Sequence, residues 1–217
     1  MFPDSLSRVA CLRIPHFQIA VLERSGAVRR GSQCVLVSGL AENTRVVAMS
    51  TAAYRSGIHT GMLLSRAIMV ANDLQVLSVE TVPVLPVTDY LSKRFQSISP
   101  RISAAEIGCF WLEPFSSGGG GEADFVSQVF ELLQEEGFAD ARAGVADTVV
   151  ASNAASRLVE TYDWIGIEPG EDATFLATLS LDYLPIGDRL RTLFNGVGIG
   201  SIRELQSFST ESIQRRF

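Results

Sequence analysis

Lysine, cysteine and histidine are all scarce in this chain. Only one of its 18 basic residues is a lysine, Lys93, which we attribute to compositional bias. The two histidines, His16 and His59, are far apart and lack a cysteine or carboxylate at metal-ligand spacing, which argues against a metal site. The cysteines are scattered, odd in number and never spaced as Cys-x-x-Cys, which argues against a disulfide framework or a zinc site. We expect them to be buried free thiols: Cys11, Cys34 and Cys109.

Several sequence signals are also missing. No stretch of about 18 apolar residues occurs, so no transmembrane helix and no membrane association are expected. The N-terminus lacks a basic-then-apolar signal with a cleavage site, so the cytoplasm is the expected compartment. No Gly-x-Ser-x-Gly pattern indicates a hydrolase of that type. No Lys-Ser/Thr follows the glycine run at residues 116–122, so we interpret it as a flexible loop and not a P-loop.

The composition is that of a globular chain with an uneven charge. Its 217 residues are 47% hydrophobic, enough for one large domain or two small ones. The net charge of −6 divides into about +5 over residues 1–101, −13 over 102–182 and +2 over 183–217. The acidic middle is interpreted as a solvated face. Alternatively, both ends meet a polyanion while the acidic middle faces away from it or meets a partner. Charge alone does not predict tight DNA binding.

Hydrophobic periodicity predicts mixed α and β structure up to residue 167 and only short helices from Ala173 onward. Phe110 and Trp111 are expected in the core. The expected strands are 8–14, 33–38, 45–50, 101–106, 109–113, 141–145 and 164–167. The expected helices are 17–24, 51–56, 62–71, 82–96, 125–136 and 148–159. This order favours an α+β core followed by a small helical module.

Four segments, in order, carry patterns seen together in one enzyme family. The strand and helix of 9–21 are followed by Val-Val-Ala-Met-Ser-Thr-Ala-Ala-Tyr-Arg-Ser-Gly in 46–62, Arg-Ala-Gly-Val-Ala-Asp-Thr in 142–156 and Asn-Gly-Val-Gly-Ile-Gly-Ser in 195–206. Leu184-Pro-Ile186 precedes the last. The set resembles the Y-family translesion DNA polymerases, with the DinB type as the active member compared.

The resemblance implies an α+β fold with a Y-family polymerase-like palm and fingers and a small all-helical thumb built on a helix-hairpin-helix. The palm would comprise residues 1–16 and 74–165, the fingers 17–73 and the thumb 166–217. The chain ends at Phe217, where family members continue. We therefore expect the little finger and the C-terminal tail to be absent from it.

The positions that match the family's metal ligands hold no carboxylate. A polymerase needs clustered carboxylates to hold two metal ions. Arg13 matches the first ligand, and Gly108 and Cys109 match the Asp-Glu pair. Arginine keeps its proton, and reversing one charge of a pair 4 Å apart changes an attraction of about 4 kcal/mol into repulsion at an effective dielectric of 20. We expect no catalytic residue, metal ion or cofactor.

The nucleotide contacts of the family are also replaced. Pro15 stands at the second aspartate and Gln18 at the aromatic residue that gates the sugar. The fingers tyrosine and arginine correspond to Thr51 and Tyr54, and the palm lysines to Val149 and Asn153. Independent parts of one site are thus lost together, so we expect no nucleotide binding.

The thumb turn offers a candidate phosphate contact. A helix start after a glycine-containing turn exposes backbone N–H groups, and Gly198 and Ser201 stand where DNA phosphate would be met. The alternative is an ordinary turn between two helices. The second Gly-Val-Gly hairpin of active relatives is not recognisable, so the expected DNA binding is weak to moderate.

The combined loss resembles the ImuB type, a catalytically degenerate relative of DinB and UmuC. It implies a non-catalytic, nucleoid-associated scaffold for SOS-induced mutagenesis. The implied partners are DNA, the sliding clamp, a RecA-like accessory protein and an error-prone DnaE-type polymerase, contacted mostly through regions beyond this chain. One alternative is an active translesion polymerase with relocated carboxylates, for which Glu106, Glu113 and Asp147 are candidates. Another is a plain DNA-binding module.

Overall fold

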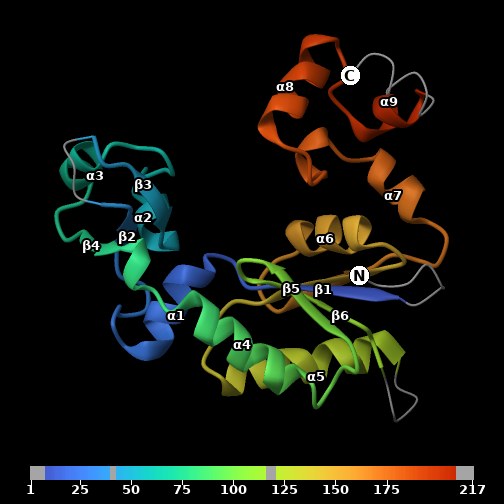
Figure 1. The fold of residues 1–217 in the computed structure, drawn as a ribbon, viewed down its shortest axis with the longest axis horizontal. Helices are drawn as coiled ribbons and strands as arrows, with labels where there is room; N and C mark the ends of the chain where they lie inside the picture. The colour runs from blue at the N-terminus through green and yellow to red at the C-terminus, as the bar shows by residue number, and fades with distance from the viewer. Residues whose placement is uncertain (1–7, 40–42, 116–120, 209–217) are drawn as a thin grey trace. The chain divides into compact units, whose positions relative to one another are not determined.

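The computed structural model describes residues 8–39, 43–115 and 121–208. Figure 1 shows strands and helices alternating along most of the chain, followed by helices alone. In the part described, no helix is long and apolar enough to cross a membrane. The strands are β1 (Val9–Arg13), β2 (Cys34–Val37), β3 (Val46–Met49), β4 (Gln75–Ser78), β5 (Ile102–Glu106), β6 (Cys109–Leu112), β7 (Arg142–Ala146) and β8 (Asp163–Gly166). The helices are α1 (Phe17–Ser25), α2 (Thr51–Arg55), α3 (Leu64–Val70), α4 (Val84–Phe95), α5 (Gly121–Glu135), α6 (Val149–Leu158), α7 (Asp172–Ala177), α8 (Asp188–Gly196) and α9 (Ile202–Gln206), with 3₁₀ turns η1 (Val79–Thr81) and η2 (Leu181–Tyr183).

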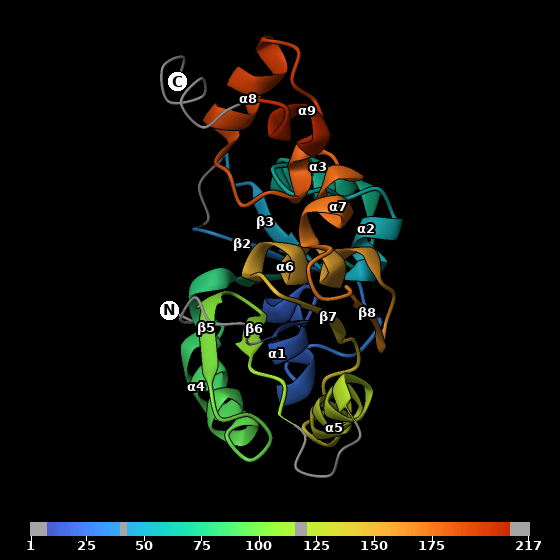
Figure 2. The same cartoon turned by 90° about the vertical axis from the view of Figure 1, so that its right-hand side faces the viewer.

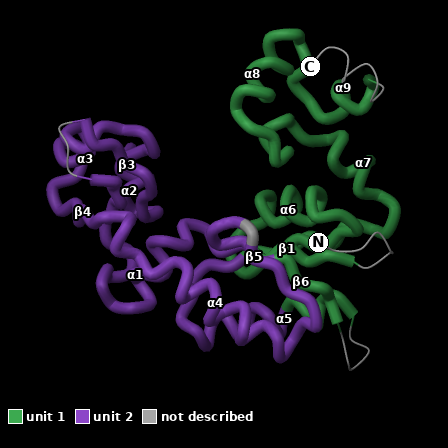
Figure 3. The backbone as a smooth tube through the Cα atoms, in the orientation of Figure 1, with its two compact units in different colours: residues 1–12, 111–126, 142–217 green, residues 13–110, 127–141 purple. Residues whose placement is uncertain are grey.

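The chain forms two compact units, each made of separated stretches (Figure 3). Unit 1 comprises residues 1–12, 111–126 and 142–217, and unit 2 comprises residues 13–110 and 127–141. This division cuts across the palm, fingers and thumb ranges inferred above, which stay a prediction.

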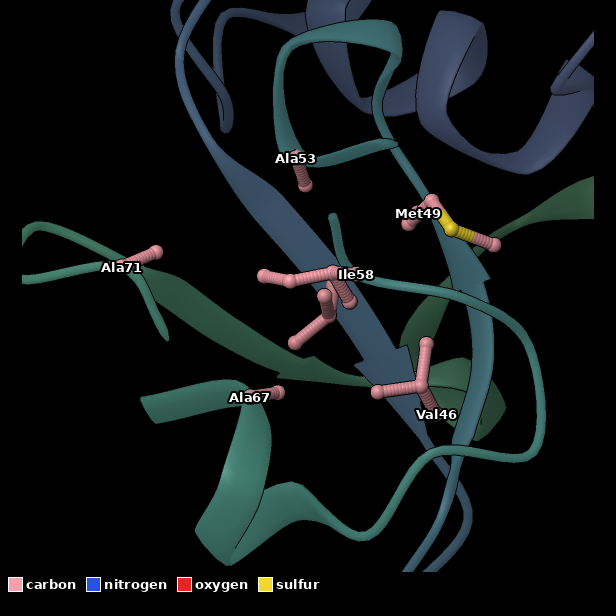
Figure 4. Close-up of a cluster of buried hydrophobic side chains, with 7 residues drawn as sticks. Val46, Met49, Ala53, Ile58, Ala67 and Ala71 are labelled. Atoms are coloured by element: carbon pink, nitrogen blue, oxygen red, sulfur yellow. The ribbon is translucent and has the colours of Figure 1, made fainter. Parts of the chain in front are cut away.

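A three-stranded sheet in unit 2 has the order β3-β2-β4. β2 pairs antiparallel with β3, and it pairs parallel with β4 in the register Cys34 to Gln75. The buried side chains around Ile58 point toward one another, as Figure 4 shows. This core consists of Val35, Val46, Met49, Ala53, Ile58, Ala67 and Ala71.

Helices α1 and α4 of unit 2 contact the C-terminal end of α5 through Glu136. The Glu136 carboxylate accepts hydrogen bonds from Tyr90 (2.8 Å), Arg94 (2.8 Å) and Arg24 (2.9 Å). Its side chain is 10% exposed. Although burial raises the pKa of Glu136, the three donors outweigh it and the pKa lies below its ordinary value. The cluster ties α1 and α4 to the C-terminal end of α5.

The second sheet has the order β5-β6-β1-β7-β8. Within unit 1, β7 and β8 are parallel, with Arg142 opposite Asp163 and Val145 opposite Gly166. Helix α6 packs on these two strands (Figure 2). Gly144 of β7 allows this close approach, because a Cβ there would lie 2.3 Å from the Ser152 carbonyl oxygen.

The last part of unit 1 is helical, as predicted. Helices α7, α8 and α9 and the turn η2 surround their own core. Gly198, with φ +82°, ends the turn after α8, and a bridge joins Ser180 to Ser201. The residues of this core are Leu181, Phe194, Ile199 and Ile202.

Most predicted elements are present, and two details differ. Phe110 and Trp111 are buried as predicted, as are the three cysteines. The strand β4 was not predicted, because its four half-buried residues show no clear alternation. Helix α5 begins at Gly121, inside the stretch predicted as a loop, and residues 116–120 of that stretch lie outside the described ranges.

Candidate functional site

The end of β1 and the turn between β5 and β6 lie side by side in unit 2. Arg13 is the last residue of β1, and Gly108 belongs to the turn. The backbone N–H of Ile14 donates a hydrogen bond of 2.8 Å to the Gly108 carbonyl oxygen. The structure therefore brings together the sequence segments that hold two of the degenerate metal-ligand positions.

Gly108 occupies a place that has no room for a side chain. Its backbone φ is +73°, in the left-handed region that glycine tolerates best. A Cβ added here would lie 2.6 Å from the Phe17 Cβ and 2.7 Å from the Ile14 carbonyl oxygen. Neither atom is the far end of a flexible side chain, so no carboxylate fits without backbone movement.

The remaining two positions do not suit a metal ion either. Cys109 is 1% exposed and opens β6 as part of the core. Arg13 adds a permanent positive charge at the end of β1. A carboxylate-bound pair of divalent cations does not fit this donor set, since the site offers a guanidinium, a glycine and a buried thiol.

The alternative acids do not form a metal site in the described structure. Within residues 8–39, 43–115 and 121–208, no group of three or more His, Cys, Asp or Glu side chains could hold a metal ion. Glu106 is exposed at the end of β5, and Glu113, just after β6, is half-buried and interacts with a neighbour. Asp147 is engaged within unit 1, as follows.

Asp147 belongs to an ion-pair network centred on Arg8. The Arg8 guanidinium donates to Asp147 Oδ1 (2.8 Å), to Glu122 Oε1 (2.6 Å) and to the Ile167 carbonyl oxygen (2.5 Å). The Gly170 N–H donates to Asp147 Oδ2 at 2.6 Å. Both carboxylate oxygens of Asp147 are therefore used by the protein. The Gly170 N–H and then Arg8 lower the pKa of Asp147 below its ordinary value.

This network predicts an acid-sensitive contribution to the stability of unit 1. Because the pKa of Asp147 is lowered in the folded state, its stabilisation is present above about 3.8, the ordinary value, and is lost as pH falls through the lowered pKa. We expect Asp147→Asn to lower the free energy of unfolding at neutral pH by about 1 kcal/mol or less. Urea unfolding of both proteins over a pH series measures this difference, which should shrink toward acidic pH.

Glu160→Gln is the matched control, because Glu160 is an exposed acid of the same unit. We expect its unfolding free energy to follow that of the unmodified chain at every pH. A constant difference between Asp147→Asn and the unmodified chain down to low pH would contradict the proposed role of the Asp147 charge.

The predicted nucleotide positions are spread over both units. In unit 2, Gln18 is half-buried on α1, Thr51 is exposed at the start of α2, and Tyr54 is 58% exposed on α2 with its ring edge-on to His59. In unit 1, Val149 begins α6 and is 38% exposed, and Asn153 is half-buried one turn later. No arginine or lysine stands at any of these positions, so the cationic contacts of the family to a triphosphate have no replacement there.

In the thumb turn, Glu204 occupies the backbone N–H of Ser201, one of the two positions expected to meet DNA, and the N–H of the other, Gly198, donates to the Asn195 carbonyl oxygen. Ser201 is the N-cap of α9, and its Oγ accepts from the Glu204 N–H at 3.3 Å. The Glu204 carboxylate accepts from the N–H groups of Gly200 (2.8 Å) and Ser201 (2.9 Å). These bonds lower the pKa of Glu204, so the turn already holds a carboxylate where a phosphate would bind. The phosphate contact assigned to Gly198 and Ser201 stays a prediction.

Two features were not anticipated from the sequence. The carboxylate of Glu204 was detectable, because Ser201-x-x-Glu204 is a capping-box pattern. The Arg8 network was not, because its partners are separated by 114 to 159 residues.

The sequence of this chain is similar to a known family and to a curated DNA polymerase. Residues 16–157 match the impB/mucB/samB family. The chain is 26% identical over 227 aligned residues to DNA polymerase IV of Dehalococcoides mccartyi, an alignment that covers 98% of this chain and 55% of the relative. The chain thus spans about half the length of this curated relative.

Solved structures share the fold. The DinB crystal structure from Sulfolobus solfataricus superposes with a TM-score of 0.75 at 18% identity. The insertion ternary complex of Dbh DNA polymerase gives 0.79, also at 18% identity. Each comparison covers 96% of this chain and 62% of the other. The predicted α+β fold with a polymerase-like palm, fingers and helical thumb is therefore confirmed.

Proposed function

Because this chain belongs to the impB/mucB/samB family and has a Y-family polymerase-like fold, we propose that it is a non-catalytic member, a scaffold for translesion synthesis. The observation that carries the proposal is Gly108. A position where catalysis would need a carboxylate instead has a Cβ-excluding backbone, closed by Phe17 and Ile14. The chain keeps the architecture while the metal-binding chemistry is replaced.

The electrostatics of Arg13 support the same proposal. A divalent cation 4 Å from a guanidinium is repelled by about 8 kcal/mol at an effective dielectric of 20, twice the value for two unit charges. Arginine does not escape this repulsion by losing its proton. In the described residues no three His, Cys, Asp or Glu side chains form a group that could hold a metal ion, and Asp147 is held by Arg8 and Gly170.

The partners of such a scaffold are those of damage-induced mutagenesis of the ImuB type. We infer weak to moderate binding to DNA and recruitment of an error-prone DnaE-type polymerase, together with the sliding clamp and a RecA-like accessory protein. A nucleoid-associated protein in the cytoplasm suits this role. The family relationship supports the DNA contact, and the ImuB-type degeneracy of Arg13, Gly108 and Cys109 suggests the other partners.

Primer extension tests the loss of catalysis. The chain is incubated with primer-template DNA, the four nucleotides and either magnesium or manganese, and Dbh DNA polymerase serves as the positive control. We expect no added nucleotide with either metal, because Arg13, Gly108 and Cys109 provide no carboxylate for a metal ion.

Extension by the chain itself would overturn the proposal. Arg13→Ala is made and purified in parallel with the unmodified chain. If both extend the primer, their activity is compared with that of three further variants, Glu106→Gln, Glu113→Gln and Asp147→Asn. A reduction in one of these three would assign activity to relocated carboxylates. Activity unchanged in all of them would indicate a contaminating polymerase and would leave the chain inactive, as proposed.

We expect the Glu204 carboxylate to weaken DNA binding by the thumb, because it occupies N–H groups of the turn that a phosphate would need. We expect Glu204→Gln to raise affinity for primer-template duplex by roughly two- to tenfold at low salt, because a phosphate no longer competes with a carboxylate. Fluorescence anisotropy at two salt concentrations measures the affinity, and the gain should shrink at the higher salt.

Glu168→Gln is the control for net charge, because Glu168 is an exposed acid of the same unit outside the turn. An equal gain from both substitutions would show that only overall charge matters, and the turn would then be an ordinary helix connection. The substitution alters the capping box, so amide hydrogen exchange is used to check that Glu204→Gln keeps helix α9.

A further inference from the structure

A cavity of about 230 Å³ lies within unit 2, where α1 and α2 begin. Its apolar lining comes from Pro15, Ile19, Ala20, Ala52 and Ala139. The cavity is smaller than the 300–1,000 Å³ that drug-sized ligands occupy, so it suits a single side chain better than a nucleotide. Its polar lining consists of His16, Glu23, Arg30, Gly31, Ser50, Thr51 and Asp140.

Glu23 is the charged residue of this lining for which the described structure provides no partner. It is half-buried on α1, and its carboxylate has no hydrogen-bond or ion-pair partner among the described residues. The charge lies near the buried Cys34, because burial and then Glu23 raise the pKa of that thiol to about 11. The Glu23 carboxylate has no partner from the described residues, and a cation in the cavity would provide one.

Among the other polar groups, Ser50 and Arg30 have partners within the protein and Asp140 adds a second acid, whereas the His16 and Thr51 side chains are exposed. Ser50 Oγ accepts from the N–H groups of Cys34 and Ala53 and donates to the Ser32 carbonyl oxygen. The Arg30 guanidinium donates to the Gly137 carbonyl oxygen. Asp140 interacts with a neighbour and contributes a second acid. The lining carries two acids, Glu23 and Asp140, and one arginine, Arg30, so its formal charge favours a cation over a phosphate.

We propose that this cavity receives an arginine side chain presented by a partner protein. The guanidinium is weakly hydrated, matches a carboxylate with two parallel hydrogen bonds and stacks its flat face on apolar walls, properties that suit Glu23 among Pro15 and Ile19. Arginine is also enriched among the residues that anchor protein interfaces in desolvated pockets. The site goes beyond the scaffold function and is independent of whether the chain polymerises nucleotides.

The probes are two tripeptides capped at both ends, Ala-Arg-Ala and Ala-citrulline-Ala, which differ only in the charge and one group of the side chain. Amide resonances of the isotope-labelled full chain are followed during titration with each. We expect Ala-Arg-Ala to shift the amides of Ala20, Gly31, Ala52 and Ala139, which line the cavity, with millimolar affinity. Ala-citrulline-Ala should leave them in place.

Glu23→Gln should weaken the binding of Ala-Arg-Ala at least tenfold, and Glu131→Gln, an exposed acid of α5 in the same unit, should not. The resonance spectrum of each variant also reports whether the fold is kept. The inference is overturned if citrulline shifts the same amides equally, if the arginine peptide shifts none of them, or if its shifts survive Glu23→Gln. Displacement of the arginine peptide by inorganic triphosphate from this cavity would also overturn it, in favour of an anion site.

Discussion

Gly108→Ala is expected to lower the free energy of unfolding by about 2–5 kcal/mol. The new Cβ would lie 2.6 Å from the Phe17 Cβ and 2.7 Å from the Ile14 carbonyl oxygen, so the turn or α1 must shift. The backbone φ of +73° adds a penalty of about 1–2 kcal/mol for alanine. The midpoint of urea unfolding, followed by circular dichroism, measures the loss.

Gly26→Ala separates the two causes. Gly26 has a φ of +77° in the same unit and no atom within 4 Å of its added Cβ, so it carries only the backbone penalty. Equal losses at the two positions would show that Gly108 is not crowded. Gly108→Asp should lose at least as much stability as Gly108→Ala. A carboxylate therefore cannot be restored here by one substitution.

Gly144→Ala is the second large effect, at about 3 kcal/mol or more. The added Cβ would lie 2.3 Å from the Ser152 carbonyl oxygen and 2.6 Å from the Ser156 nitrogen, both in the backbone of α6. Relief requires α6 to move away from β7, which opens the buried layer between them. Tryptophan fluorescence during urea unfolding measures the effect, because Trp111 and Trp164 both lie in unit 1 with Gly144.

Gly196→Ala provides the comparison within unit 1. Gly196 is the last residue of α8, and no atom lies within 4 Å of its added Cβ. Alanine favours the helix over glycine by up to about 1 kcal/mol, so stability should be unchanged or higher. If Gly144→Ala were tolerated as well as Gly196→Ala, the close packing of α6 on β7 would be disproved.

The sequence predicts most of this fold because its strands and helices carry clear periodic patterns. The Cys34–Val37 run is apolar at every position, as expected of a fully buried strand, and the amphipathic α5 shows the helical period directly. The half-buried β4 has no such pattern, and its position is set by pairing with β2. Tertiary pairing of this kind is not encoded in a local window.

The sequence predicts which residue types stand at the candidate site. It does not predict the packing around them. The sequence resemblance predicts that Gly108 stands where the family has a carboxylate, but only the structure reveals that Phe17 closes the space. The unpaired state of Glu23 is equally hidden, since on the sequence it is one more acid on a helix. Separation in the chain, as between Arg8 and Ile167, removes any local signal.

The Arg8 network also bears on how the chain emerges from the ribosome. Arg8 and its acceptor at Ile167 are 159 residues apart, and synthesis at 5–20 residues per second separates them by roughly 8–32 seconds. The Arg8 guanidinium has neither of its carboxylate partners until Glu122 has been made, and the apolar Val9–Arg13 strand lacks β7, one of its neighbours in the sheet, until Ala146 has been made. The ion pairs of Arg8 are therefore completed late in synthesis, after residues 13–110 of unit 2 have been made.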